Sequence, residues 1–145
     1  MIFYRLGYQL HRTNHALTVA SEKPLKPLGV THAQVNVLLF VDRFPGATMA
    51  RLARLAVITP QALQRTAIRL ERLGFIHRDR KSGDDKSFYL SLTDKGVQTL
   101  RQTESELKAV QDIAKTHFQP QELDALYEML QRYEAMFQDT KKEEL

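Results

Sequence analysis

Residues 59–92 have the sequence TPQALQRTAIRLERLGFIHRDRKSGDDKSFYLSL, which predicts a helix, a tight stop and a two-stranded ribbon. Thr59 is a favourable N-cap, and Pro60 suits the first helical position, where an N–H would have no helical partner. Gly74 supplies the left-handed residue that ends many helices. After it, apolar and polar residues alternate over 87–92, as in a half-buried strand. Helix, stop and ribbon in this order are typical of a winged helix.

The helix that starts at Pro60 has two chemically different faces. Leucine and alanine recur at helical spacing and form the expected buried stripe, namely Leu63, Ala67, Leu70 and Leu73. The opposite face carries long polar side chains, namely Gln61, Arg65, Arg69 and Arg72. Arginine on the outer face of an amphipathic helix is usually only solvated, so these side chains alone do not indicate a ligand. The short helix before them and the charged hairpin after them favour a helix that reads a DNA groove.

The rest of the chain is predicted to be helical. Helices are expected over 2–22, 31–43, 48–56, 60–73, 93–118 and 120–138, with prolines breaking the chain at 24 and 27. Thr31 and Gln34 have the spacing of a capping box, and Thr48 can cap the short third helix. The last helix carries a heptad seam, the candidate dimer contacts Leu123, Leu126, Leu130, Tyr133 and Phe137. This seam can pack within the chain or against a second copy, and we favour the second copy.

The fold class is therefore mainly α with a small β-hairpin wing. Residues 31–92 are expected to form a winged helix-turn-helix that binds DNA. Residues 1–30 and 93–145 are expected to form one helical dimerisation region, in which Leu6 and Leu10 of the first helix also take part.

Charge is distributed unevenly along the 145 residues. The stretch 43–90 holds ten basic and four acidic side chains, a net charge of +6, whereas 102–145 holds five basic and ten acidic ones. One part suits a polyanion and the other would repel it. The absence of cysteine excludes disulfides, iron–sulfur clusters and thiol redox sensing. No apolar run approaches the ~20 residues of a membrane span, and the N-terminus lacks the pattern of a signal peptide, so we expect a cytoplasmic protein without a membrane partner.

Several short strings, in this order and at these separations, resemble the MarR family of bacterial transcription regulators. They are Leu6-Gly7-Tyr8-Gln9-Leu10, Leu28-Gly29-Val30-Thr31, Leu70-Glu71-Arg72-Leu73-Gly74-Phe75-Ile76, Asp84-Asp85-Lys86 and Leu90-Ser91-Leu92-Thr93-Asp94-Lys95-Gly96. The resemblance implies a homodimer that binds a pseudo-palindromic operator in double-stranded DNA, most often as a repressor. It also implies that a small aromatic or phenolic ligand, bound between the dimerisation and DNA-binding parts, releases the DNA. The family wing typically carries Asp-x-Arg, whereas this chain ends the same string in Lys86.

These arguments give a set of candidate site residues. A recognition helix enters the major groove by its N-terminal end, which favours Gln61, Gln64 and Arg65 for base edges and Arg69 for phosphate. The full set of expected DNA contacts is Thr48, Thr59, Pro60, Gln61, Gln64, Arg65, Arg69, Arg80, Lys81 and Lys86. The family's usual ligand location suggests Tyr4, Tyr8, His11, His15 and His32, which serve equally well as packing or surface residues.

Two other classes of protein stay open. An enzyme would need a nucleophile with its base, a paired acid and base, or a glycine-rich phosphate loop. The serines near His77 and Asp79 lie on a hairpin arm that offers no water-excluding pocket, so catalysis is not expected. A winged helix can also dock proteins, and weak salt dependence on DNA would favour that role. His11 and His15 have the spacing of a helical metal pair but lack a third ligand, so neither a metal nor another cofactor is expected.

Overall fold

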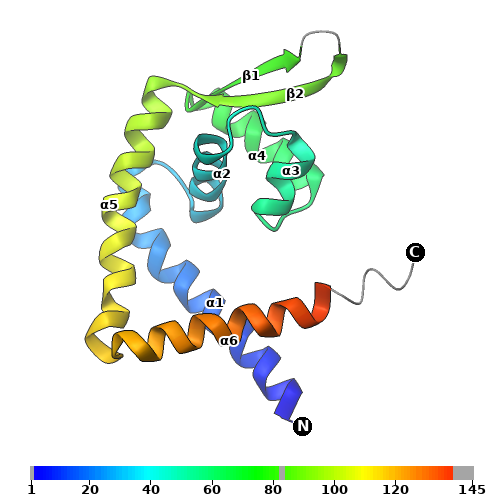
Figure 1. Ribbon diagram of the computed structural model, residues 1–145. Coiled ribbons are helices and arrows are strands. Elements are labelled where there is room, and N and C mark those ends of the chain that lie inside the picture. Colours follow the sequence, from blue (N-terminus) through cyan, green and yellow to red (C-terminus); the bar gives the residue numbers. More distant parts are fainter. Residues whose placement is uncertain (1, 82–83, 139–145) are drawn as a thin grey trace. The chain divides into compact units, whose positions relative to one another are not determined.

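The computed structural model describes residues 2–81 and 84–138, with the side chains of 4–80 and 88–138. Its elements, in chain order, are α1 (Ile2–Leu25), the 3-10 turn η1 (Lys26–Leu28), α2 (His32–Arg43), α3 (Met49–Leu55), α4 (Pro60–Arg72), β1 (Ile76–Lys81), β2 (Asp84–Leu92), α5 (Asp94–His117) and α6 (Pro120–Gln138) (Figure 1). The expected mainly helical fold with one hairpin is confirmed. The chain forms two compact units, Met1–Lys108 and Ala109–Leu145.

Helix α1 runs further than its prolines suggested. It continues through Pro24 to Leu25, three residues beyond the expected end at residue 22, and η1 follows without a gap. The side chain of Leu25 is fully buried, so packing of the last turn outweighs the backbone hydrogen bond that a proline removes. Gly29, with φ 72°, then reverses the chain into α2.

Helix α2 begins with the expected capping box. Thr31 Oγ1 accepts a hydrogen bond from the Gln34 backbone N–H at 3.2 Å, and Gln34 Oε1 accepts one from the Thr31 N–H at 2.9 Å. Two otherwise unpaired donors at the helix N-terminus are thereby satisfied. The helix is the centre of unit Met1–Lys108, since Val37 and Leu38 are almost completely inaccessible to solvent.

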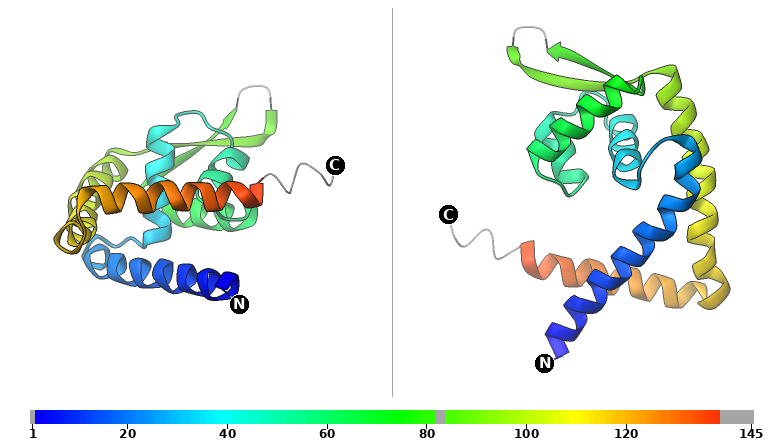
Figure 2. Two further views of the ribbon diagram at one scale, coloured as in Figure 1. Left: turned by 60° about the horizontal axis from the view of Figure 1, so that its bottom comes forward. Right: turned by 180° about the vertical axis from the view of Figure 1, so that it is seen from behind.

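The core of this unit is assembled mainly from α2, α3, α4 and the base of the hairpin, and Leu25 of α1 and Leu100 of α5 complete it (Figure 2). Helices α3 and α4 contribute Leu52, Leu63 and Leu70, each at most 2% exposed, and the hairpin contributes Ile76 and Leu90. Fully burying one such side chain stabilises a fold by about 1.5–3 kcal/mol. Helix-turn-helix and hairpin are therefore one packed body.

The hairpin is antiparallel, with Ile76 opposite Leu92 and Arg78 opposite Leu90. Its register shifts between Arg80, which lies opposite Phe88, and Lys81, which lies opposite Asp84. Among the strand residues whose side chains are described, the buried ones are Ile76 and Leu90 at the base, where they pack against the core, and the strands then leave the core. The expected two-stranded wing is confirmed.

Helix α6, in unit Ala109–Leu145, has no buried residue in the described chain. It nevertheless carries large apolar side chains, among them Tyr127, Met129 and Phe137, each more than half exposed. A soluble helix with so much exposed apolar area needs another surface to pack against.

Candidate DNA-binding surface

The N-terminus of α4 is built as the sequence predicted. Thr59 Oγ1 accepts a hydrogen bond from the backbone N–H of Ala62 at 3.1 Å, and Pro60 occupies the first turn. The same construction recurs on α3, where Thr48 Oγ1 accepts from the backbone N–H of Arg51 at 3.2 Å. Two threonine-capped helix N-termini therefore belong to one helix-turn-helix, and such termini attract phosphate.

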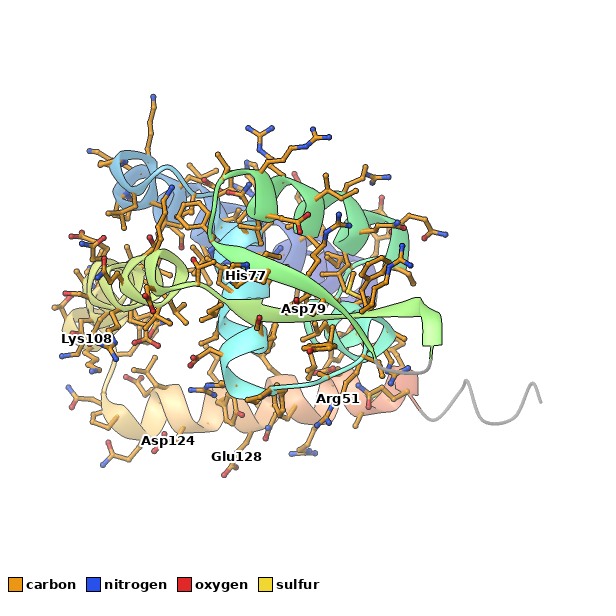
Figure 3. The ribbon with its side chains drawn as sticks, turned by 90° about the horizontal axis from the view of Figure 1, so that it is seen from above. Arg51, His77, Asp79, Lys108, Asp124 and Glu128 are labelled. Atoms are coloured by element: carbon orange, nitrogen blue, oxygen red, sulfur yellow. The ribbon has the colours of Figure 1, made fainter. Side chains whose placement is uncertain are left out.

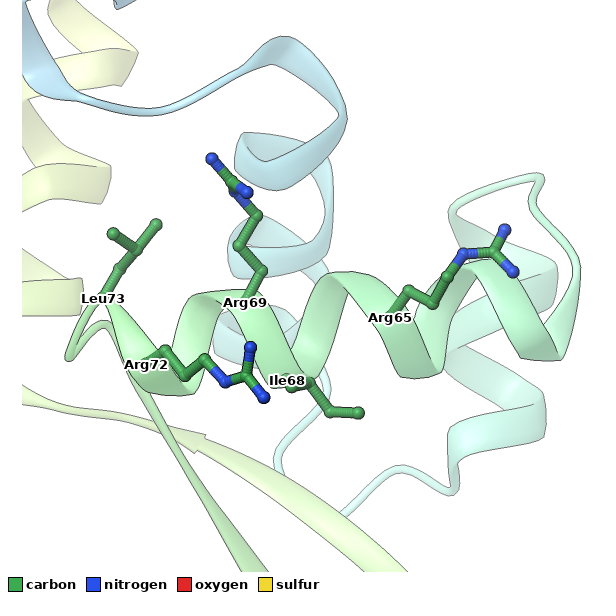
Figure 4. Close-up of a pocket in the computed structure, with 5 residues that line it drawn as sticks. All are labelled: Arg65, Ile68, Arg69, Arg72 and Leu73. Atoms are coloured by element: carbon green, nitrogen blue, oxygen red, sulfur yellow. The ribbon is translucent and has the colours of Figure 1, made fainter.

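The outer face of α4 carries the predicted polar side chains. Leu63, Ala67 and Leu70 are fully buried, which turns the opposite side of the helix outward. That side presents exposed Gln61, Gln64, Arg65, Arg69 and Arg72. Figure 4 shows the three arginines around a shallow hollow whose apolar lining is Ile68 and Leu73. A helix that buries leucine and exposes glutamine and arginine matches the chemistry of base edges and phosphates.

The position of Leu73 differs from the sequence prediction. It was expected on the buried stripe, but its side chain is 37% exposed. The helix ends at Arg72, and Gly74 takes the left-handed conformation with φ 80°, so Leu73 is the capping residue rather than part of the stripe. The Gly74 N–H donates to Glu71 O and the Phe75 N–H to Leu70 O, both at 2.9 Å, which satisfies the last carbonyls.

The start of α5 closes this helix end. Thr93 Oγ1 donates to Gly74 O at 2.6 Å, and the Lys95 ammonium donates to Leu73 O at 2.6 Å while it lies 4.6 Å from the centre of the Phe75 ring. A cation at a helix C-terminus is favourable because it opposes the helix dipole. The sequence Leu-Thr-x-Lys-Gly after the wing therefore fixes the end of the recognition helix.

The wing is held to the recognition helix by an ion pair. Arg78 Nε donates to Glu71 Oε2 at 2.6 Å, across the junction between α4 and β1. This pair joins the wing to the helix, and the side chains of the wing residues Asp84 and Asp85 lie outside the described part of the structure. The guanidinium groups of Arg78 and Arg80 lie 5.5 and 5.7 Å from the centre of the Phe88 ring.

The remaining wing candidates cannot be placed. Lys81 and Lys86 belong to β1 and β2, but their side chains lie outside the described part of the structure, as does the hairpin tip at 82–83. Arg80 is the wing candidate whose side chain is described.

Arg51 of α3 is fixed more firmly than its exposed position suggests. Its guanidinium lies 4.8 Å from the centre of the Phe44 ring, a cation–π contact worth about 0.5–1 kcal/mol at an exposed site. From its position alone, an exposed arginine on α3 can be either a phosphate contact or a solvated charge. Stacking on Phe44 holds the charge near the capped end of α3, which favours a phosphate contact.

The turn between α3 and α4 contains a strained residue. Val57 has φ 54°, the one non-glycine residue with positive φ in the described ranges, and its side chain is 89% exposed. A β-branched side chain in this conformation costs about 1–2 kcal/mol, and Val57 regains little by packing.

Replacing Val57 by glycine is expected to stabilise the protein by about 0.5–1 kcal/mol, because relief of the strain exceeds the entropy that glycine adds to the unfolded chain. Urea unfolding followed by circular dichroism measures the change. Val57→Ala is the matched control, and it should gain less than half as much because alanine keeps a Cβ. Equal gains for both variants would mean that the backbone angle is not the cause.

The ligand candidates suggested by the family lie on α1 and at the start of α2. Tyr4, Tyr8, His11 and His15 are exposed, with Tyr4 84% exposed, and none of them lines the hollow on α4. His32 is half-buried; its backbone N–H donates to Glu22 Oε1 at 3.0 Å. Its Nδ1 atom is buried and has no hydrogen-bond partner among the described residues.

The candidate dimer contacts are all unburied within the single chain. On α1, Leu6 is exposed and Leu10 half-buried; on α6, Leu126, Leu130 and Phe137 are exposed. The other two members of the seam, Leu123 and Tyr133, are half-buried. The rings of Tyr133 and Phe137, the last two members of the seam, meet edge to face with centroids 5.2 Å apart.

The described residues offer little support for catalysis, metal binding or a membrane-spanning helix. His77 and Asp79 lie on β1 (Figure 3), where the Ser91 hydroxyl is 3.5 Å from Asp79 Oδ2 and His77 is exposed. Over 2–81 and 84–138, no three His, Asp or Glu side chains are placed to hold a metal ion. Within the same ranges, every helix is too short or too polar to span a lipid bilayer.

Fold and surface together define a winged helix-turn-helix protein, and comparison with known proteins identifies its family. Residues 28–86 match the model of the MarR family. The chain is 32% identical over 104 residues to the HTH-type transcriptional repressor Rv2887 of Mycobacterium tuberculosis, covering 72% of this chain and 75% of the relative. The chain therefore belongs to the MarR family of transcription regulators.

Solved structures agree with this assignment. CouR, a transcriptional repressor bound to a 23-mer DNA duplex, superposes with a TM-score of 0.82 at 29% identity over 88% of this chain and 91% of CouR. Rv2887 in complex with salicylic acid gives a TM-score of 0.68 at 27% identity, covering 88% of this chain and 95% of that one. A mutant of MarR from E. coli complexed with operator DNA has the same fold, with a TM-score of 0.83 at 22% identity over 89% and 93% of the two chains.

Sequence reasoning missed three features of this surface. The pairing of Glu71 with Arg78 and that of Lys95 with the Leu73 carbonyl join residues 7 and 22 positions apart. Lys95 lies in the first turn of α5, so no local pattern in the sequence pointed to the second pair. Ile68, on the outer side of α4, was passed over because its neighbours are charged.

Proposed function

We propose that this protein is a cytoplasmic transcription repressor that binds a pseudo-palindromic operator as a homodimer. The observation that carries the proposal is the threonine-capped helix α4, with glutamine and arginine along its exposed face. The proposal is supported by the repressor Rv2887, which is 32% identical, and by CouR, a repressor bound to a DNA duplex. Two copies of α4 would occupy successive major grooves, about 34–36 Å apart.

Each element would have its own part in DNA binding. Gln61, Gln64 and Arg65 lie in the first half of α4 and would meet base edges, because glutamine pairs with adenine and arginine with guanine. Arg69, one turn later, would meet phosphate. The exposed N-termini at Thr48 and Thr59–Pro60 would bind phosphate through hydroxyl and backbone N–H groups. Arg80, Lys81 and Lys86 of the wing would contact the backbone or the minor groove.

Dimerisation would use residues 1–30 and 93–145. Helix α6 has no fully buried residue among those described, although its seam is apolar. Exposed apolar faces of this kind mark interfaces between proteins. A second copy supplies an equivalent face, and two-fold symmetry then matches the symmetry of the operator.

A small aromatic acid or phenol would release the DNA. The 27% identical structure of Rv2887 holds salicylic acid. In this chain the candidates for such a ligand are Tyr4, Tyr8, His11, His15 and His32, of which His32 presents a buried ring nitrogen that lacks a partner among the described residues. The ligand must bind the released form more tightly than the DNA-bound form, since equal affinity shifts nothing.

The test is fluorescence anisotropy of the full chain with labelled DNA from upstream of its own gene, with scrambled competitor and a salt titration. We expect tight binding that resists the competitor. The logarithm of the association constant should fall with the logarithm of salt, with a slope of about −0.9 for each phosphate neutralised. Equal binding to scrambled DNA, or little salt dependence, would contradict the proposal and favour a protein-docking role for the winged helix.

Arg65→Ala is expected to relax discrimination at one base pair in each half-site. A bidentate contact to guanine is worth about 1–3 kcal/mol, so the preference should fall by about 5- to 150-fold. Competition with operators mutated at each position measures the change. Arg65→Lys is the control: it should lose base preference but keep the salt slope, since lysine retains the charge without the bidentate fork. Unchanged preference in both variants would place base reading elsewhere on α4.

A further inference from the structure

Ile68 is an apolar side chain on the face of α4 that points away from the core. It follows the fully buried Leu63 by five residues, which places it about 140° around the helix from that side chain. It is not among the partly buried apolar residues that pack against the core. The fold therefore gives Ile68 no evident structural role.

The surroundings of Ile68 are cationic. Arg65 and Arg72 lie three residues before and four residues after it, so all three occupy neighbouring positions on one side of the helix. Figure 4 shows Ile68 beside the Arg72 side chain in the hollow that the arginines line. Ile68 is half-buried although it does not join the core, which fits cover by the aliphatic stems of long neighbouring side chains.

We propose that Ile68 reads the C5-methyl group of a thymine in each operator half-site. This inference rests on the proposed function, in which the exposed face of α4 lies in the major groove. Thymine is the one base that presents a methyl group there, and apolar side chains recognise it by contact. Three residues of helix rise by about 4.5 Å, so the thymine lies one or two base pairs from the base pair that Arg65 contacts.

This contact gives the helix a second kind of selectivity. Arg65, Gln61 and Gln64 distinguish bases by hydrogen bonds, whereas Ile68 distinguishes thymine from cytosine, and from uracil, by one methyl group. Removal of that methyl group exposes apolar surface of Ile68 that had been buried. The transfer free energy of one methyl or methylene group corresponds to about a three- to fivefold change in the dissociation constant.

The experiment replaces each operator thymine in turn by deoxyuridine, which removes the methyl group and leaves every hydrogen-bonding group in place. Dissociation constants are measured for the unaltered protein, Ile68→Ala and Ile68→Val. We expect one thymine position per half-site at which deoxyuridine weakens the unaltered protein about three- to fivefold. At that position Ile68→Ala should be insensitive and Ile68→Val intermediate.

Arg65→Ala is the matched control on the same helix. It should bind the operator more weakly overall but keep the full sensitivity to deoxyuridine at that position. Thermal unfolding of Ile68→Ala should match that of the unaltered protein, since the side chain is outside the core. If deoxyuridine has the same effect on Ile68→Ala and the unaltered protein at every position, the inference is wrong although the protein is still an operator-binding regulator. If the unaltered protein does not prefer operator to scrambled DNA, the proposed function is wrong as well.

Discussion

Gly96→Ala is expected to destabilise the protein by about 3 kcal/mol or more, and no surface substitution considered above should approach this effect. A Cβ built on Gly96 would lie 2.1 Å from the carbonyl oxygen of Phe75 and 3.1 Å from its carbonyl carbon. Both are backbone atoms, so no side chain can rotate away. Overpacking in a close-packed region commonly costs about 1–3 kcal/mol, and here α5 must separate from the base of the wing.

Urea unfolding followed by circular dichroism measures the loss, together with the yield of folded protein. Gly7→Ala is the matched control, because a Cβ at that helical glycine meets nothing within 4 Å in this chain. It should leave stability unchanged or raise it by up to about 1 kcal/mol, since alanine favours the helix over glycine. Equal stabilities for Gly96→Ala and the unaltered protein would show that α5 does not approach Phe75 this closely in solution.

The double substitution Leu130→Glu and Tyr133→Glu is expected to convert the dimer into monomers. The two side chains lie three residues apart on the α6 seam, with Leu130 40% exposed and Tyr133 half-buried in the single chain. If a second copy covers them, each glutamate places an unpaired charge in an apolar interface. Operator affinity should fall by at least about 100-fold, since each subunit then binds one half-site alone.

Analytical ultracentrifugation measures the oligomeric state, and anisotropy measures the operator affinity. Gln121→Glu with Gln131→Glu is the control, because it adds two negative charges to the same helix at exposed positions off the seam. This variant should stay dimeric and keep its operator affinity. If the Leu130 and Tyr133 variant still forms a stable dimer, the seam packs within one chain and is not the dimer interface.

Features set by neighbouring residues could be predicted from the sequence. The capping box of Thr31 and Gln34, the cap at Thr59 and the helix stop at Gly74 each depend on residues within four positions. The polar face of α4 was also predictable, because once the leucine stripe is buried the opposite residues must face outward. The principal candidates on the DNA-binding surface are such residues.

Features that depend on distant residues could not be predicted in this way. Helix α1 continues through Pro24 because the side chain of Leu25 is buried in the core. The proline in the sequence does not show that this buried position exists. The pairing of Arg78 with Glu71 depends on how the strand leaves the helix, which no local sequence pattern shows. In the proposed dimer, the surface that covers α6 belongs to a second copy, which no pattern of neighbouring residues specifies.

The closure of α4 by the first turn of α5 has a mechanical consequence. Thr93 and Lys95 hold the carbonyls of Gly74 and Leu73, and Gly96 lies against Phe75 with no room for a side chain. These contacts therefore connect the end of the recognition helix rigidly to the beginning of α5. If the first turns of α5 tilt, the recognition helix is expected to tilt with them. Mutations in the first turns of α5 are therefore expected to change operator affinity without touching a residue of α4.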